Sequence, residues 1–147
     1  MDRPKVIPTV YLILVKGSKI LLSRRYNTGF QDGQYSFPAG HPSCDNEALH
    51  HTMIREAEEE IGIKIDPRDL ELVHVMHRRQ TEPTNERRIN LFFAVKKCKG
   101  KPRIMEPNKC DDLRWFELNS LPDNMIPYIK QAVNCFQRNE KYSEYGF

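Results

Sequence analysis

Hydrophobic and polar residues alternate in short blocks over the first 40 positions, a pattern that predicts strands. Residues 10–15 (VYLILV) and 20–25 (ILLSRR) are rich in aliphatic and β-branched side chains, and the KGSK between them is a turn sequence. This combination predicts a β-hairpin. A polar loop over residues 27–34 follows, and it leads to a short extended piece over residues 35–40 (YSFPAG), which ends in proline and glycine residues.

The rest of the chain predicts two helices and three more strands. Apolar residues recur at helical spacing over residues 47–61, and Gly62 is well placed to end that helix. The other predicted elements are strands over residues 70–79, 88–97 and 113–118 and a second amphipathic helix over residues 126–137. Strands outnumber helices and do not alternate with them regularly. We therefore predict one α/β domain over residues 1–147, in which a mixed sheet carries a helix on each face.

The first helix carries an unusual concentration of acid, because four of the six residues from Arg55 to Glu60 are glutamates. On a helical wheel at about 100° per residue, the apolar residues form one arc that must face the core. Glu60 falls inside this arc, and Glu56 and Glu59 lie at or near its edge. Glu58 lies on the far side, where a solvated helix face explains it. A buried glutamate, in contrast, needs a partner or a metal ion. The apolar residues of the arc are Leu49, Met53, Ile54, Ala57 and Ile61.

Three converging carboxylates would repel one another strongly. At about 5 Å and an effective dielectric constant of about 20, each pair costs roughly 3 kcal/mol. Arg55 can offset one charge, whereas a divalent cation can offset all three. Oxygen ligands without Cys or paired His favour Mg²⁺, with Mn²⁺ as an alternative. Magnesium held by carboxylates most often serves substrate phosphates, so the segment predicts hydrolysis at phosphorus, with one carboxylate taking the proton from water.

The composition excludes several classes of partner and cofactor. The formal net charge of +3 is too small to indicate a nucleic-acid partner. The four cysteines lie far apart, which predicts reduced thiols in a cytoplasmic protein and excludes the usual zinc spacings. No apolar run reaches the roughly 18 residues that a membrane helix needs. We therefore expect a cytoplasmic domain with no membrane partner.

With these observations in hand, the sequence resembles the Nudix box, G-x5-E-x7-R-E-U-x-E-E-x-G-U, in which U is apolar. Glu47, seven further residues and then residues 55–63 (REAEEEIGI) fit this pattern at every position. Six residues (HPSCDN) separate Gly40 from Glu47, whereas the pattern has five, and we expect a longer loop to absorb the difference. The hairpin, the YSFPAG segment and the late WF strand are also similar, so the resemblance covers about residues 8–137. It implies the Nudix α/β/α sandwich and hydrolysis of a nucleoside diphosphate linked to a further group.

The resemblance also implies roles for residues of the box. Glu56, Glu59 and Glu60, together with the carbonyl of Gly40, would bind the metal ion, and Glu56 or Glu59 would activate the water. Arg55 would orient the carboxylates. Glu47, two turns away, would pair with Arg55 and hold the loop on the helix. The alternative for Glu47 is a first-turn glutamate that the helix dipole favours.

The sequence says less about the substrate than about the metal site. The short single domain most resembles the MutT-like pyrophosphohydrolases, which convert a nucleoside or deoxynucleoside triphosphate to the monophosphate and pyrophosphate. Arg24 or Arg25 is a candidate phosphate contact, because a guanidinium group matches phosphate oxygens. Glu106 could be an additional ligand or base, and Asp111 could contact a base edge or be a solvated loop residue. Phe37 could stack on a base or belong to the core.

Two other interpretations stay open. The substrate could be another nucleoside diphosphate derivative, such as ADP-ribose, a nucleotide sugar, a dinucleotide polyphosphate or an RNA cap. The domain could also be a nucleotide-binding module without catalysis, although the intact box glutamates favour a hydrolase. In each case the expected partner is a small-molecule nucleotide and not a stably bound nucleic acid. The aromatic tail over residues 141–147 (KYSEYGF) could pack on its own domain or on a second copy, which leaves a homodimer open.

Overall fold

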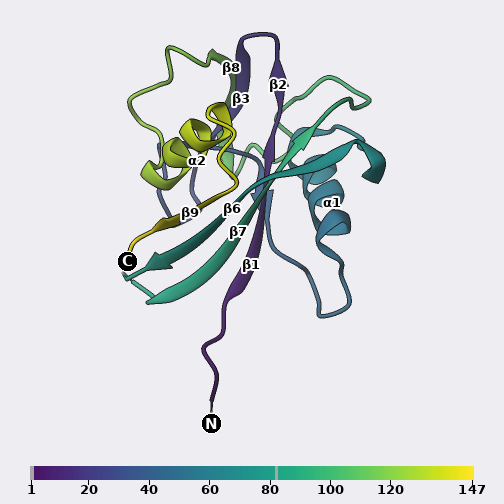
Figure 1. The fold of residues 1–147 in the computed structure, drawn as a ribbon. Helices are drawn as coiled ribbons and strands as arrows, with labels where there is room; N and C mark the ends of the chain where they lie inside the picture. Colours follow the sequence, from purple (N-terminus) through teal and green to yellow (C-terminus); the bar gives the residue numbers. More distant parts are fainter. Residues whose placement is uncertain (1, 82) are drawn as a thin grey trace.

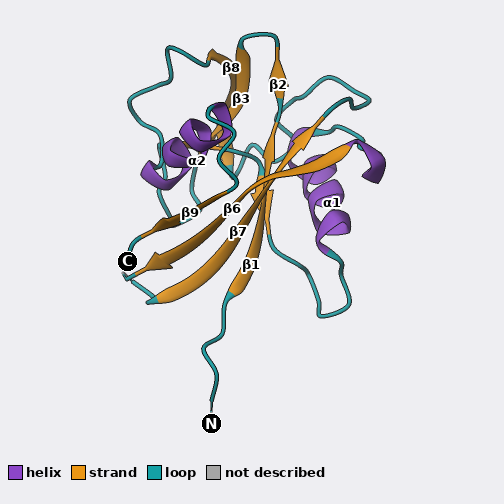
Figure 2. Ribbon diagram, viewed as in Figure 1, coloured by secondary structure: helices purple, strands orange, loops and turns teal. Residues whose placement is uncertain are grey.

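The computed structural model describes residues 2–81 and 83–147, and in these residues the chain forms two β-sheets and two α-helices (Figures 1 and 2). The first sheet has the strand order β5-β1-β7-β6-β9, and the second contains β2, β3, β4 and β8. The strands of the first sheet are β1 (Ile7–Ile13), β5 (Ala39–Gly40), β6 (Leu70–Gln80), β7 (Glu86–Val95) and β9 (Tyr142–Tyr145). Those of the second are β2 (Val15–Lys16), β3 (Lys19–Arg25), β4 (Tyr35–Ser36) and β8 (Cys110–Glu117). The helices are α1 (Leu49–Ile61) and α2 (Pro127–Gln137), and a 3-10 turn, η1, spans Pro67–Asp69.

The first sheet is mixed, as the sequence predicts. Strand β1 runs parallel to β7 and antiparallel to β5, β6 pairs antiparallel with β7, and β9 is parallel to β6. In the second sheet β3 pairs antiparallel with β2, β4 and β8. The short strands β4 and β5 come from the YSFPAG segment, which therefore passes from the second sheet to the first.

The predicted hairpin over residues 10–25 is wrong in one respect, because its first strand divides between the two sheets. Ile13 pairs with Ala94 in the first sheet, whereas Val15 pairs with Ile20 in the second. Leu14, which is buried, is the one residue between them. The uninterrupted apolar run explains the difference, because a strand that is buried on both faces can belong to the centre of a larger sheet.

The two helices cover opposite faces of the first sheet, which confirms the predicted α/β/α sandwich (Figure 1). Helix α1 contributes Met53, Ala57 and Ile61 to one core, and α2 contributes Ile129, Ala132 and Val133 to the other. Alternate residues of β1 point to the two sides. Val10 and Leu12 pack in the α1 core, and Tyr11 and Ile13 pack in the α2 core. Burial on both faces accounts for the continuous apolar sequence of this strand.

Helix α1 begins two residues later than predicted and ends where the sequence places its end. Ala48 occupies the N-cap position with no side-chain hydrogen bond, and Glu47 belongs to the preceding loop. Gly62 adopts a left-handed conformation with φ of 71°, and its N–H donates to the carbonyl of Glu58 over 3.1 Å. Glycine takes this conformation without steric cost, which explains the helix end.

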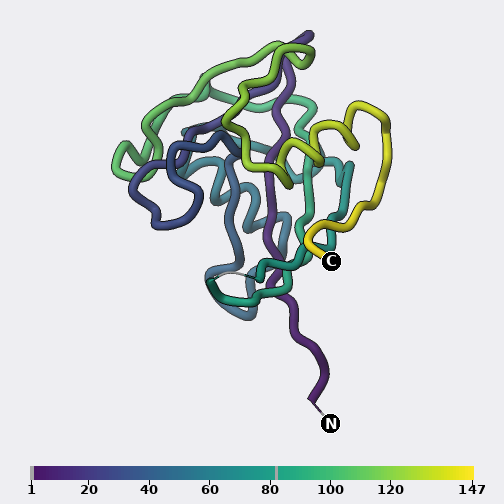
Figure 3. The backbone as a smooth tube through the Cα atoms, turned by 90° about the vertical axis from the view of Figure 1, so that its left-hand side faces the viewer, coloured from purple at the N-terminus to yellow at the C-terminus, as the bar shows by residue number. Residues whose placement is uncertain are grey.

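The aromatic tail packs on its own domain as strand β9, an element that the strand predictions omit. Val75 to Arg78 of β6 pair with Tyr142 to Tyr145, so the tail covers the outer edge of the first sheet (Figure 3). The buried His74 ring contacts the Ser143 hydroxyl over 2.7 Å and the Glu140 carbonyl over 2.8 Å. The His77 and Phe147 rings lie 4.5 Å apart. Side-chain contacts between distant residues therefore fix the tail.

Two predictions about the chain as a whole can be compared with the structure. Cys44, Cys98, Cys110 and Cys135 are all free, which agrees with reduced thiols. In the described ranges no helix is long and apolar enough to cross a membrane.

Candidate active site

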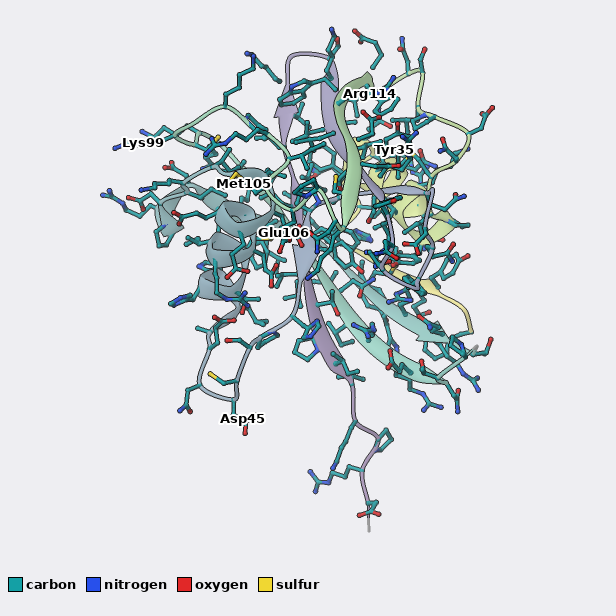
Figure 4. The ribbon with its side chains drawn as sticks, turned by 180° about the vertical axis from the view of Figure 1, so that it is seen from behind. Tyr35, Asp45, Lys99, Met105, Glu106 and Arg114 are labelled. Atoms are coloured by element: carbon teal, nitrogen blue, oxygen red, sulfur yellow. The ribbon has the colours of Figure 1, made fainter. Side chains whose placement is uncertain are left out.

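A cavity of about 680 Å³ lies between helix α1, strand β3 and the face of the first sheet that α2 covers. Its acidic end, at α1, carries Glu56 and Glu60 beside Gly40, with Arg24 and Arg25 on the neighbouring wall. Its basic end, at β6 and β7, carries Arg78 and Arg88 beside Tyr128. Figure 4 shows Glu106, which also lines the cavity, between α1 and β8. The cavity is therefore acidic at one end and basic at the other.

Two carboxylates of α1, those of Glu56 and Glu60, face each other at the acidic end. Glu60 accepts a hydrogen bond from the backbone N–H of Ala39 over 3.1 Å. Burial, together with the charge of Glu56, raises the pKa of Glu60 to about 8. Burial also raises the pKa of Glu56, although hydrogen bonding to Arg55 opposes this effect. Near neutral pH the pair therefore holds a proton in the absence of a cation.

Gly40 lies directly against the Glu56 side chain and has no room for a side chain of its own. A Cβ atom built on Gly40 would overlap the carboxyl group and Cγ of Glu56. Strand β5 holds this position, because Gly40 pairs with Val10 of β1. The extra residue between Gly40 and Glu47 lies in the following loop and does not disturb the contact.

Arg55 connects the carboxylates of the box. Its Nε and Nη2 donate to Glu47 over 2.8 and 2.9 Å, and its Nη1 donates to Glu56 over 2.9 Å and to Glu59 over 3.1 Å. Hydrogen bonding to Arg55 lowers the pKa of Glu47 to about 2. The Thr52 hydroxyl and the Ser43 N–H also donate to Glu47, over 2.9 and 3.1 Å. The predicted pairing of Glu47 with Arg55 is therefore present, and it ties the loop to the helix.

Glu59 differs from the sequence-based expectation that three glutamates converge. Its side chain is 52% exposed and is held by Arg55, outside the residues that line the cavity. Within residues 2–81 and 83–147, no three Asp, Glu, His or Cys side chains lie close enough together to hold a metal ion. The physical reason is the i, i+4 ion pair with Arg55, which takes up the Glu59 carboxylate.

The acidic end nevertheless fits a hard divalent cation. Glu56 and Glu60 supply two oxygen ligands whose repulsion a cation would relieve, and the close approach of Gly40 brings a backbone segment to the same place. Glu106 is close enough for its charge to raise the pKa of Glu60 further. Donors of this kind are typical of magnesium sites.

The two predicted phosphate contacts of β3 lie on the cavity wall and are partly engaged by neighbouring residues. Arg24 Nε forms an ion pair with Asp111 over 2.7 Å. Arg25 donates from Nε to the Phe30 carbonyl over 2.6 Å and from Nη2 to the Thr28 hydroxyl over 3.0 Å, which braces the loop over residues 27–34. Asp111 therefore has Arg24 as its partner, and its position does not distinguish a base contact from a loop residue.

Phe37 and Glu106 occupy different depths. Phe37 is 2% exposed and packs edge-on against Phe92 at a centroid distance of 6.1 Å, which favours its interpretation as a core aromatic. The Glu106 carboxylate is 35% exposed, lines the cavity and lies 3.9 Å from Lys109 Nζ. It therefore remains available to a ligand.

The structure brings Tyr35, predicted as a possible stacking residue, and Asp112, predicted as a possible base contact, together with Arg114, which sequence reasoning does not single out. Asp112 accepts hydrogen bonds from the hydroxyl of Tyr35 and from Nε of Arg114, the latter over 2.7 Å, and Figure 4 shows Tyr35 and Arg114 on the same side of the second sheet. The basic end of the cavity, with Arg78 and Arg88, is a feature that sequence reasoning does not predict. Only the strand register reveals that these two arginines lie opposite each other.

Comparison with solved structures supports the fold. A MutT NUDIX hydrolase from Burkholderia pseudomallei superposes with a TM-score of 0.80, at 24% identity, and covers 90% of this chain and 98% of that one. The E. coli ORF135 protein superposes with a TM-score of 0.72, at 23% identity, over 92% of this chain and 91% of that one. At these identities the likeness concerns the fold.

Sequence comparison extends to the family. A protein described as the NAD-capped RNA hydrolase NudC of Stutzerimonas stutzeri (strain A1501) is 26% identical over 119 residues, which cover 81% of this chain. The matched region spans 39% of the length of that relative. The family model of the NUDIX domain matches residues 5–135, nearly the whole chain. With the intact box on α1 and the cavity beside it, this match shows that the chain belongs to the NUDIX family of hydrolases.

Proposed function

We propose that the protein hydrolyses a nucleoside or deoxynucleoside triphosphate to the monophosphate and pyrophosphate, with Mg²⁺ as the cofactor and Mn²⁺ as a substitute. The observation that carries this proposal is the pair formed by Glu56 and Glu60, which lines a nucleotide-sized cavity. Two carboxylates that share a proton near neutral pH are poised for a cation. Pockets of roughly 300–1,000 Å³ are typical of small-molecule sites, which the volume of about 680 Å³ matches.

The metal ligands in this proposal are Glu56, Glu59 and Glu60, together with the carbonyl of Gly40. A bound divalent cation would neutralise the carboxylates, polarise the phosphoryl group and lower the pKa of a coordinated water. Glu59 would join this set by leaving Arg55, which keeps Glu47 as a partner through two other hydrogen bonds. The contact of Gly40 with Glu56 supports a fixed position for that carboxylate.

Residues of the box also accept the proton of the attacking water and hold the accepting carboxylate in position. Glu56 or Glu59 takes a proton from the attacking water, whose oxygen forms a new bond to phosphorus. The anhydride bond between the α and β phosphates breaks, and the phosphate on the far side of that bond leaves with its electron pair, which gives the monophosphate and pyrophosphate. Arg55 orients the carboxylates through its fork of donors, and Glu47 fixes Arg55. General-base assistance of this kind contributes about 10² to 10⁴ in rate.

Residues around the cavity would position the substrate. Arg24 and Arg25 lie on its wall and offer guanidinium groups to phosphate oxygens. Glu106 is available as a further ligand or base, and Asp111 acts through Arg24, its ion-pair partner. Phe37 would contribute to the floor beneath the substrate, because its ring lies in the core and also lines the cavity.

The test is a panel of all nucleoside and deoxynucleoside triphosphates, 8-oxo-dGTP, ADP-ribose, NADH and a dinucleotide polyphosphate, each with Mg²⁺, followed by product chromatography. We expect one triphosphate to give the monophosphate and pyrophosphate. Glu56→Gln and Glu59→Gln should abolish this turnover.

The matched control is Glu58→Gln, which removes an exposed glutamate from the same helix and should retain turnover. Turnover confined to a substrate other than a triphosphate would replace the proposed substrate class. Absence of turnover with both Mg²⁺ and Mn²⁺, in a folded protein, would favour a binding module.

A further inference from the structure

The basic end of the cavity is a charged pocket that the proposed chemistry does not use. Arg78 of β6 and Arg88 of β7 lie directly opposite each other in the antiparallel ladder and point to the same face of the sheet. Tyr128 of α2 and Tyr11 of β1 complete the walls, with their hydroxyl groups 3.4 Å apart. Like charges in directly opposed positions destabilise a sheet, so this arrangement needs a compensating interaction.

Arg78 lacks that compensation among the described residues. The residue is 4% exposed, and its guanidinium carbon lies 4.1 Å from the centre of the Tyr128 ring. Its Nη1 donates to the Gln80 side-chain oxygen over 3.2 Å, and its Nε is buried without a hydrogen-bond partner. Buried guanidinium groups are normally paired with an anion, because removing a charge from water is costly.

The nearest acid already belongs to the other arginine. Glu86 accepts from Nε and Nη2 of Arg88 over 3.1 and 2.7 Å, and this hydrogen bonding lowers the pKa of Glu86. Arg88 Nη1 donates to the Thr9 hydroxyl over 2.9 Å. Two guanidinium groups therefore share one carboxylate, and the described part of the pocket keeps one uncompensated positive charge.

We propose that this pocket, formed by Arg78, Arg88 and Tyr128, binds a phosphate group of the substrate that is separate from the anhydride cleaved at the glutamates. The inference rests on the proposed hydrolase function and deepens it, because it assigns the substrate to nucleotides that carry a second, remote phosphate. The cavity is continuous from Glu56 to Arg78, so one molecule can occupy both ends.

A neutral ligand fits the observations less well. The O6 and N7 atoms of a guanine ring can accept from a guanidinium group. Such an edge would satisfy the free Nε of Arg78 but would leave the excess charge in place. A phosphate offers three acceptor oxygens and negative charge at the same time, which meets both requirements.

The first experiment measures anion binding without catalysis. The thermal midpoint is recorded in EDTA with increasing inorganic phosphate, against chloride of equal ionic strength. We expect phosphate to raise the midpoint of the wild type and not that of Arg78→Met. Arg68→Met is the control, because it removes an exposed arginine that pairs with Asp66 at the surface, and it should keep the wild-type response.

A second variant places a negative charge next to Arg78 as part of the protein itself. Gln80→Glu is isosteric and places a carboxylate beside Nη1 of Arg78. We expect this variant to be more stable than the wild type without phosphate and to lose the response to phosphate. Equal phosphate responses in the wild type, Arg78→Met and Gln80→Glu would overturn the proposal, whether or not the protein is a hydrolase.

The matching substrate experiment compares compounds that differ by a remote phosphate: NADPH with NADH, coenzyme A with its 3′-dephospho form, and a 3′-diphosphorylated GTP with GTP. We expect the phosphorylated member of a pair to have the higher kcat/KM, by about tenfold or more, as for one charged hydrogen bond. Arg78→Met should reduce that ratio toward one, and Arg68→Met should not. A preference for guanine compounds that ignores the extra phosphate would establish the guanine edge instead and refute the phosphate.

Discussion

Replacement of Glu60 by glutamine should make the protein more stable at alkaline pH when no divalent cation is present. The buried carboxyl group has its pKa raised from 4.5 to about 8, so the folded state binds its proton more tightly than the unfolded state. The contribution of Glu60 to stability is therefore fully present below pH 4.5 and is lost as the pH rises through about 8. At about 1.4 kcal/mol for each pH unit in that window, the ionised group costs the folded state about 5 kcal/mol.

The glutamine side chain keeps the shape and removes the charge. Its amide oxygen can still accept the hydrogen bond from the Ala39 N–H. For a domain of this size, a gain of this magnitude corresponds to an increase of about 10 °C or more in the thermal midpoint at pH 9. The same substitution removes a proposed metal ligand, so added Mg²⁺ should raise the midpoint of the wild type at pH 9 and leave that of Glu60→Gln nearly unchanged.

The assay is thermal unfolding followed by circular dichroism between pH 5 and 9, in EDTA and in Mg²⁺. Comparison of two variants at each pH cancels the contributions of other titrating groups. Glu58→Gln serves as the control, because Glu58 is exposed on the same helix and its replacement should not change the pH dependence. The reasoning fails if Glu60→Gln is no more stable than the wild type at pH 9 in EDTA.

Three further substitutions or truncations follow from the geometry. Gly40→Ala should displace the Glu56 side chain and so lower kcat by about 10² or more, whereas the free energy of unfolding should fall by only about 1–3 kcal/mol. A normal kcat in steady-state assays would show that this contact is dispensable. Arg55 holds the pKa of Glu47 at about 2, so the contribution of the Glu47 carboxylate to stability is present above pH 4.5 and is lost as the pH falls toward 2. Glu47→Gln should remove this acid dependence from thermal unfolding curves recorded between pH 2 and 5. Removal of residues 142–147 breaks the pairing of β9 with β6 and the hydrogen bonds between His74 and Ser143 and between Gln131 and the Glu144 carbonyl. At about 1 kcal/mol for each hydrogen bond, the free energy of unfolding should fall by at least about 2 kcal/mol. An unchanged urea midpoint would mean that the tail does not stabilise the sheet.

Local patterns in the sequence predict the box helix well. The end of α1 at Gly62 and the position of Glu60 within the apolar arc depend only on residues within a few turns, so periodicity and glycine conformation are sufficient. The pairing of Glu47 with Arg55 is also local, because only eight positions separate them, although Glu47 lies in the loop before α1. The family pattern adds the Gly40 carbonyl as a metal ligand, which no periodicity could reveal, but it does not predict the contact of Gly40 with the Glu56 side chain.

The features that sequence reasoning misses depend on distant contacts. The position of Arg78 opposite Arg88 follows from the register of the β6–β7 ladder. A slip of one residue in this register would turn the side chains of the shifted strand to the other face of the sheet. The tail forms β9 because β6 offers an open edge, and its own sequence carries only weak strand character. Without a cation the Glu59 carboxylate pairs with Arg55, one turn earlier, and points away from Glu56 and Glu60. Which partner a side chain binds depends on the partners that the fold brings near it, and sequence spacing alone does not give these.

The position of Leu14 has a consequence for the mobility of the cavity. This single buried residue joins the strand that runs through the first sheet to the strand that opens the second, so the two walls of the cavity share one continuous piece of backbone. A hydrogen bond from the Leu21 N–H to the Leu14 carbonyl, 3.0 Å long, fixes the junction. Rotation of one sheet against the other would therefore strain this hydrogen-bonded junction. We expect slow amide exchange at residue 21, and fast exchange there would show that the two sheets move independently.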